Sequence, residues 1–119
     1  MKNLAFTLFL LISIISVAIA QNAKNDLDVK GTYHINSIIP LGKFRLWAEI
    51  SNNSKYDYKD ITFKAEFVAG DGTVEGSKNF TLHDYIGPGI SKKLKEQYEV
   101  CPKDCKSIKL SIVSGKRLN

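Results

Sequence analysis

Hydrophobic residues recur at every second position through much of this chain, and this alternation constrains the fold more than any other feature. A two-residue period is typical of a β-strand that buries one face. Segments 29–36, 44–50, 61–67 and 108–113 all have this period, so the sequence predicts four strands. Their apolar faces carry Val29, Tyr33 and Ile35; Phe44, Leu46, Ala48 and Ile50; Ile61, Phe63, Ala65 and Phe67; and Ile108, Leu110 and Ile112.

Two further segments, 73–82 and 90–100, have a weaker pattern with more polar interruptions. In the second, Ile90, Leu94 and Tyr98 recur every four residues, which is also the spacing of a short helix. A Gly-Pro-Gly turn before this segment and a Cys-Pro pair after it favour a strand, with a helix as the alternative.

Turn residues separate the predicted strands. Gly70-Asp71-Gly72 indicates a hairpin, because Asp and Gly tolerate the positive φ of tight turns, and residues 52–60 form a longer polar connection. About seven short strands at roughly ten-residue spacing, without a convincing helix, predict an all-β fold. We expect residues 29–119 to form a single antiparallel β-sandwich.

The N-terminal residues 1–20 have the pattern of a secretory signal peptide. Lys2 precedes an apolar stretch, and Ala18-Ile19-Ala20 supplies small residues for cleavage before Gln21. An uncleaved membrane anchor is the alternative, because the apolar stretch approaches the length that spans a bilayer. Residues 21–28 would then form a flexible leader.

Cleavage would change both the location and the charge of the working protein. Removal of Lys2 with the signal leaves 99 residues with 16 basic and 12 acidic side chains, a net charge of +4. We expect an exported, periplasmic or extracellular protein without stable membrane insertion once the signal is cleaved. Nucleic acid is not an expected partner, because an exported protein is separated from the nucleic acid of the cell. The basic residues also do not interleave with aromatic ones, as they do in many nucleic-acid-binding segments.

Two cysteines, Cys101 and Cys105, are separated by three residues. In an exported chain such a pair predicts a disulfide that closes a tight turn. An intermolecular bond or free thiols are alternatives. Zinc is another competing interpretation, but it needs further ligands, and His34 and His83 lack a metal-binding spacing. The sequence therefore predicts no metal site and no cofactor.

Catalytic groups are sparse. His83 and Asp84 are adjacent, so a strand would direct them to opposite faces, away from a general-base pairing. Neither Ser77 nor Ser91 lies in a nucleophile motif. We expect no catalytic residues and no enzyme activity, with His83 and Asp84 ending a strand before the Gly-Pro-Gly turn.

Aromatic and basic residues supply the candidate binding sites. Trp47 falls on the polar face of its strand beside Arg45, a pairing common among interface hot spots; the alternative is a Trp covered by neighbouring side chains. Tyr56 and Tyr58 in the polar connection could form a stacking platform or pack the loop onto the sheet. Lysines at 92–95 and basic residues at 106–117 would form a positive strip if the last two strands paired, serving a ligand or protecting a sheet edge.

Residues 44–113 resemble the FxLYD-type immunoglobulin-like domains of secreted and envelope-anchored bacterial proteins. The resemblance rests on Asn52-Asn53-Ser54 closing a strand, the strand 61–67, the hairpin at 70–72, and Leu82 followed by the 87–89 turn. The Leu-Tyr-Asp element is replaced by Val-Ala-Gly-Asp at 68–71. The resemblance implies an exported, non-catalytic β-sandwich.

The sequence thus favours an exported binding or protein-interaction module with an unknown protein or glycan partner. The alternative function is a structural or assembly component of the cell envelope that acts by sheet-edge pairing.

Overall fold

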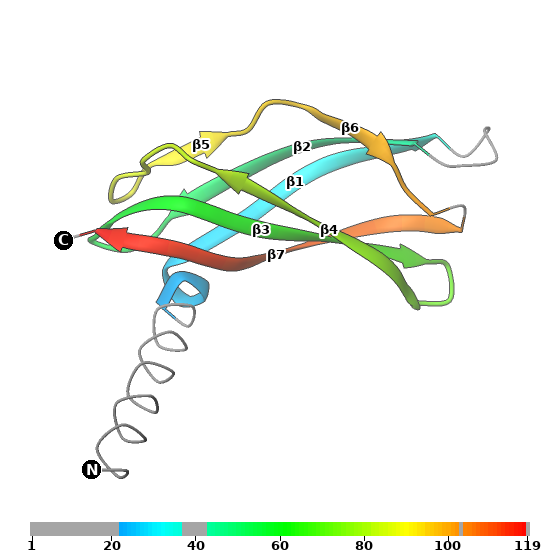
Figure 1. Ribbon diagram of the computed structural model, residues 1–119, viewed down its shortest axis with the longest axis horizontal. Coiled ribbons are helices and arrows are strands. Elements are labelled where there is room, and N and C mark those ends of the chain that lie inside the picture. The colour runs from blue at the N-terminus through cyan, green and yellow to red at the C-terminus, as the bar shows by residue number, and fades with distance from the viewer. Residues whose placement is uncertain (1–21, 37–42, 103, 119) are drawn as a thin grey trace, which may run out of the picture.

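The computed structural model describes residues 22–36, 43–102 and 104–118, so the predicted signal peptide at residues 1–20 lies outside the described part. Within this part, seven strands form two antiparallel sheets compatible with a β-sandwich (Figure 1). No described helix is long and apolar enough to cross a membrane. The strands are β1 (Leu27–Asn36), β2 (Lys43–Asn52), β3 (Asp57–Ala69), β4 (Val74–Leu82), β5 (Ser91–Lys93), β6 (Gln97–Val100) and β7 (Cys105–Leu118).

Each sheet has a long central strand. In sheet A, β2 pairs along its whole length with β1, from Leu27↔Asn52 to Asn36↔Lys43, and its other side pairs with both β5 and β6. In sheet B, β3 lies between β4 and β7. The sheets therefore place β2 and β3, which are neighbours in the chain, at the centres of opposite layers.

The predicted alternation is confirmed in both central strands. The four apolar residues of 44–50 and the four of 61–67 are all buried, while the residues between them are half-buried or exposed. The aromatic rings of Phe44 and Phe67 meet between the sheets with centroids 5.3 Å apart, and Phe63 stacks on Phe80 at 5.4 Å. Burial of these large apolar side chains is the main driving force that holds the two layers together.

The strand preferred for residues 90–100 is confirmed, and the helical alternative is wrong. The strand is broken into β5 and β6 by residues 94–96, yet both pieces stay on the same edge of β2. The break itself is tied to that strand, because the Leu94 amide donates a hydrogen bond to the Ala48 carbonyl over 2.9 Å. Pairing with β2 gives backbone N–H and C=O groups of residues 91–93 and 97–100 hydrogen-bond partners. A short helix would leave the groups at its two ends without partners inside the helix.

The structure corrects two expectations near the start of the domain. Residues 22–26 form a helical turn whose Ala23 is buried, rather than an unstructured leader. The polar connection expected at 52–60 is also shorter, because β3 already begins at Asp57. The early start escaped detection because the first buried residue of β3 is Tyr58, which stands among charged neighbours in the sequence.

Candidate functional site

Trp47 lies on the outer face of sheet A, because the core side of β2 is taken by its even-numbered residues. Its side chain is 43% exposed and faces Thr32 of β1 across the pair. The indole borders a groove of about 410 Å³. The groove is lined by Lys30, Gly31, Thr32, Trp47, Ala48, Glu49, Lys93 and Leu94.

Charged side chains form one end of this groove. Glu49 stands between Lys30 on β1 and Lys93 on β5 in the register of the sheet. The Lys30 Nζ lies 3.6 Å from the Glu49 carboxylate, with the lysine largely exposed. The Glu49 side chain is 25% exposed, and an ion pair that is open to solvent on one side contributes little to stability, so the lysine remains available to a ligand.

A second, smaller pocket lies further along the same face. It has a volume of about 230 Å³ and is lined by His34, Lys43, Arg45 and Tyr98. His34, Arg45 and Tyr98 form one row across β1, β2 and β6. The Lys43 Nζ and the Arg45 Cζ each lie 5.6 Å from the centroid of the Tyr98 ring, within the range of cation–π attraction.

The two hollows form one continuous surface, which we call the basic–aromatic face. Its members are Lys30, Thr32, His34, Lys43, Arg45, Trp47, Glu49, Lys93, Leu94, Glu96 and Tyr98. Alternate residues of β2 lie about 7 Å apart, so the stretch from Lys43 to Glu49 spans about 20 Å. Because Trp47 and the 56%-exposed Tyr98 both lie here, the face offers two accessible aromatic rings among basic groups.

Of the members of this face, sequence reasoning named Lys93 only within the predicted positive strip, and it singled out Trp47 and Arg45 as a candidate site. The alternation does place Lys43 and Glu49 in phase with them, and that signal was available. Tyr98 was missed because its segment had two competing interpretations, and its position depends on which strand pairs with β2.

Of the two interpretations of Tyr56 and Tyr58, the stacking platform is wrong, and the packing of both rings against the core is confirmed. Tyr58 is fully buried, and its hydroxyl donates a hydrogen bond to the Asp26 Oδ2 over 2.5 Å. Tyr56 is half-buried, with the Arg117 guanidinium 4.3 Å from its ring centroid. Strand alternation at Tyr56 and Tyr58 does not produce a shared exposed side, because the strand begins between them at Asp57.

The predicted disulfide is not formed in the structure. Cys101 and Cys105 are free, buried thiols, and the pair is not at disulfide distance. The Cys105 Sγ donates a hydrogen bond to the Ser107 carbonyl oxygen over 3.4 Å, and burial raises the pKa of Cys101 to about 11. The close spacing in the sequence brings the cysteines together at the β6–β7 turn without fixing the geometry that a covalent bond requires.

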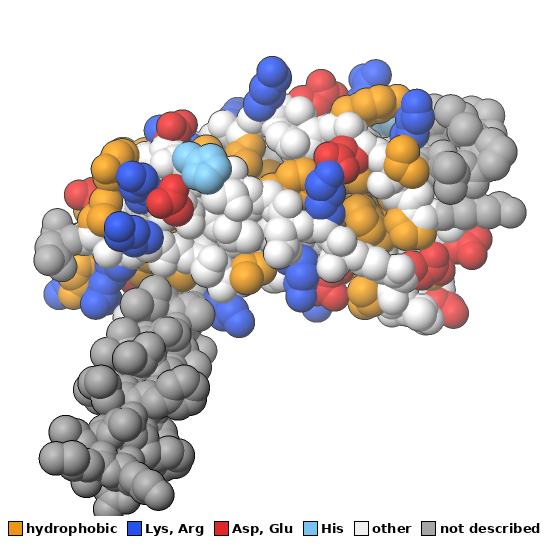
Figure 2. Space-filling model, viewed as in Figure 1, with side chains coloured by type: hydrophobic (Ala, Val, Ile, Leu, Met, Phe, Trp, Pro, Cys, Tyr) orange, Lys and Arg blue, Asp and Glu red, His pale blue; other side chains and the backbone are white. Residues whose placement is uncertain are grey.

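The predicted positive strip is also absent, because the last two strands do not pair. β6 joins β2 in sheet A, while β7 joins β3 in sheet B. Lys93 and Lys109 consequently belong to different layers. Figure 2 shows Lys and Arg side chains interspersed with acidic ones over the visible face.

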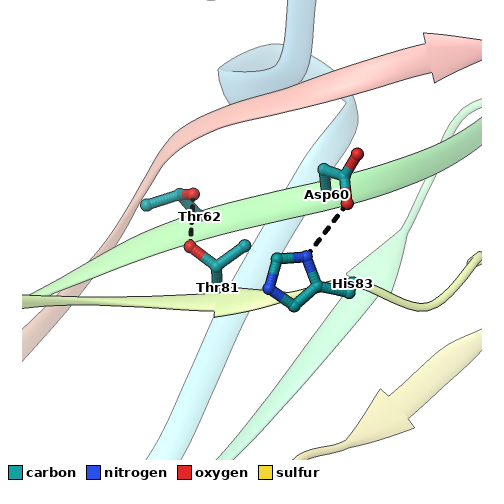
Figure 3. A network of polar contacts seen from close by, with 4 residues as sticks. All are labelled: Asp60, Thr62, Thr81 and His83. Atoms are coloured by element: carbon teal, nitrogen blue, oxygen red, sulfur yellow. Dashed lines mark hydrogen bonds and ion pairs between the residues drawn. The ribbon is translucent and has the colours of Figure 1, made fainter.

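His83 has an acidic partner that its sequence neighbours did not indicate. Its Nδ1 lies 3.1 Å from the Asp60 Oδ1 on β3 (Figure 3). Asp84 instead approaches Lys92, with its Oδ2 3.7 Å from the lysine Nζ. Beside the pair of His83 and Asp60, the hydroxyls of Thr62 and Thr81 lie 2.8 Å apart across β3 and β4. The His83 side chain is highly exposed and lines neither hollow of the basic–aromatic face.

Metal ligands do not gather in the described part of the chain: none of its His, Cys, Asp and Glu residues form a group of three or more suited to a metal ion.

Comparisons with known proteins add little to this geometry. No protein-family model matches the chain, and no curated protein matches it. The chain is similar to the Northeast Structural Genomics Consortium target SoR45, with 12% identity and a TM-score of 0.49 over 81% of this chain and 88% of that one. It is also similar to the Salmonella enterica trimeric lipoprotein SadB, with 10% identity and a TM-score of 0.43 over 93% and 73% of the two chains.

Proposed function

We propose that the protein is an exported, non-catalytic binding module that holds its partner on the basic–aromatic face. The observation that carries this proposal is the position of Trp47, which stays accessible in a groove although it is large and apolar. Exposed Trp and Tyr beside Arg are the residues that dominate binding energy in known interfaces. The predicted signal peptide supports export.

The strand order supports an immunoglobulin-like version of the sandwich. The order β1-β2-β5 facing β4-β3-β7 corresponds to strands A-B-E facing C′-C-F of an immunoglobulin domain. Rigid sandwiches of this kind commonly serve as scaffolds for binding, and the resemblance to FxLYD-type domains agrees with that role.

The charged groups of the face are better suited to binding a ligand than to catalysing a reaction of that ligand. Glu49 is paired with Lys30, and Glu96 lies 3.7 Å from Arg45. General acid–base catalysis needs a proton-transferring group within hydrogen-bond reach of the reacting atom in a pocket that excludes water. The face is instead a shallow surface of about 20 Å along β2.

The experiment compares two variants that each remove one exposed aromatic ring, Trp47 on the face and Tyr85 outside it. Purified protein is immobilised and exposed to cell-envelope extract, with Trp47→Ala and Tyr85→Ala as matched variants. Tyr85 is also exposed and lies near a cation, Lys59, but outside the face. We expect Trp47→Ala to lose the retained partner and Tyr85→Ala to keep it. Equal retention by both variants would overturn the proposal.

A second candidate function is assembly through a sheet edge. β7 is the longest strand and forms the outer strand of sheet B, where it pairs with β3 among the described strands. Such an edge can accept a strand from another chain. Light scattering over a range of concentrations would reveal this function as a rise in mass that Trp47→Ala does not abolish.

A further inference from the structure

We propose that the basic–aromatic face binds an acidic oligosaccharide, with a sugar ring against Trp47 and an acidic substituent held by Lys43 and Arg45. This inference rests on the proposed function and names the chemical class of its ligand. The two hollows supply the two kinds of contact that such a ligand needs.

The Trp47 groove fits a sugar ring. A pyranose has an apolar C–H face and a rim of hydroxyls, and the indole offers a flat apolar surface for that face. Around the indole, Thr32 supplies a hydroxyl, Lys30 and Lys93 supply donors, and Glu49 supplies acceptors. Polar groups therefore surround a flat aromatic surface. A sugar has the same combination of an apolar face and polar edges, whereas an entirely apolar ligand would leave the polar groups without partners.

The second pocket fits an anionic substituent. Lys43 forms no ion pair with any residue that the structure describes, so its charge is free for a ligand. Arg45 touches Glu96 only at 3.7 Å, and both side chains are solvent-exposed, which makes this a weak contact. A guanidinium and an ammonium that flank one pocket match a carboxylate or sulfate group, because Arg binds such groups with two parallel hydrogen bonds.

Spacing connects the two hollows. Arg45 and Trp47 are alternate residues on one face of β2, about 7 Å apart. An acidic group on the same or the next sugar can therefore reach Arg45 while a neighbouring ring contacts Trp47. The face thus suits a chain of sugars better than a single small anion.

Charge density distinguishes this ligand from other polyanions. Four basic residues (Lys30, Lys43, Arg45 and Lys93) and two acidic ones (Glu49 and Glu96) give a net charge of +2 over about 20 Å. A nucleic acid strand carries a phosphate about every 3.4 Å and would meet two repelling carboxylates here. Anionic membranes attract polybasic clusters without interspersed acidic residues. Widely spaced acidic groups on a neutral polymer fit the face better.

The test titrates the purified protein with four kinds of probe and follows Trp47 fluorescence. The probes are an acidic oligosaccharide (oligogalacturonate, with a sulfated heparin fragment in parallel), a neutral cello-oligosaccharide of matched length, inorganic polyphosphate, and phosphatidylglycerol vesicles. We expect either or both acidic oligosaccharides to bind, with affinity that falls as salt rises.

Variants identify the contacts. Lys43→Gln combined with Arg45→Gln should weaken acidic-oligosaccharide binding by about tenfold or more. Lys106→Gln combined with Lys109→Gln removes the same charge from exposed positions of β7 and should leave binding unchanged. Trp47→Ala, followed by calorimetry because the reporter is lost, should abolish binding of the sugar ring.

The outcomes separate the inference from the proposed function. Equal binding of the neutral oligosaccharide, or tighter binding of polyphosphate or vesicles, overturns the acidic-oligosaccharide assignment. If no carbohydrate binds but an envelope partner is retained in a Trp47-dependent way, the inference fails and the proposed function stands. If that retention also fails to depend on Trp47, both fail.

Discussion

The phenol of Tyr58 donates a hydrogen bond to the Asp26 carboxylate over 2.5 Å, and this contact joins the helical turn at residues 22–26 to the start of β3. The Tyr58 ring is fully buried, so its hydroxyl needs a partner inside the protein. A second link runs beside it, because the backbone N–H of Asn53 donates a hydrogen bond to the backbone carbonyl oxygen of Asp26 over 2.8 Å. The turn is therefore attached to the domain through a buried polar contact as well as through the burial of Ala23.

Removing the hydroxyl should measure the strength of this link. We expect Tyr58→Phe to lower the free energy of unfolding by about 1–2 kcal/mol, because one hydrogen bond to a charged group is lost while the ring stays in place. Urea denaturation followed by Trp47 fluorescence gives the value. Tyr85→Phe, on an exposed ring, is the control and should change stability little. Identical urea midpoints for the two variants would contradict the prediction.

The same residue predicts a loss of stability in alkali. Burial, followed by the hydrogen bond to Asp26, raises the pKa of Tyr58 above its ordinary value of 10.0. Above about pH 10 the unfolded chain loses this proton more readily than the folded one, so unfolding becomes easier as pH rises. Urea midpoints measured between pH 8 and about 11 should fall, and those of Tyr58→Phe should fall less steeply. Parallel curves would show that Tyr58 does not titrate differently on folding.

The sequence predicted the interior of this fold better than its surface. Alternation identified the buried faces of 44–50 and 61–67, because burial acts on every second residue of a strand whichever strand lies beside it. The neighbours of Trp47 could not be predicted in the same way. Tyr98 reaches the basic–aromatic face only because β5 and β6 both return to β2, and this pairing depends on contacts between distant parts of the chain. Tyr58 was assigned to a polar connection, although the structure buries it in β3, because its neighbours in the sequence are charged and show no two-residue alternation of hydrophobic residues.

A glycine sets the close approach of β1 and β2 beside the Trp47 groove. A Cβ added to Gly31 would lie 2.5 Å from the Trp47 carbonyl oxygen and 3.1 Å from the Ala48 Cα, which are backbone atoms that cannot rotate away. We expect Gly31→Ala to destabilise the protein by about 1–3 kcal/mol and to shift Trp47 fluorescence. Gly70→Ala is the matched control, because its Cβ would make an ordinary 3.6 Å contact with the Lys106 side chain. Equal urea midpoints for the two variants would show that β1 adjusts freely.

Asn52 organises the connection between β2 and β3. Its buried amide donates to the carbonyls of Tyr56 (2.6 Å) and Ile86 (2.9 Å), while its carbonyl oxygen accepts from the backbone and hydroxyl of Ser54. Replacing it leaves several of these buried groups unpaired, so we expect Asn52→Ala to cost about 2–4 kcal/mol. Asn79→Ala, on the exposed side of β4, should cost less than about 0.5 kcal/mol. Thermal unfolding of both variants tests the difference, and similar losses would contradict this role.

The cysteine pair predicts a thiol reactivity that depends on folding and on pH. Cys101 and Cys105 are both buried, and burial raises the pKa of both thiols, that of Cys101 to about 11. Because the thiolate is the reactive form, a thiol reagent should react slowly with the folded protein at pH 7 and faster as pH rises towards 11.

In urea without reductant, both thiols should react at once with the same reagent, giving two equivalents per chain. The unfolded chain has ordinary thiol pKa values near 9, so the folded state should also lose stability between pH 9 and about 11, where the unfolded state has already released its protons. Cys101→Ala should leave one equivalent and a shallower fall of stability with pH. Fewer than two equivalents from the unfolded wild-type chain would show that the pair is oxidised, and would contradict the free thiols at the β6–β7 turn.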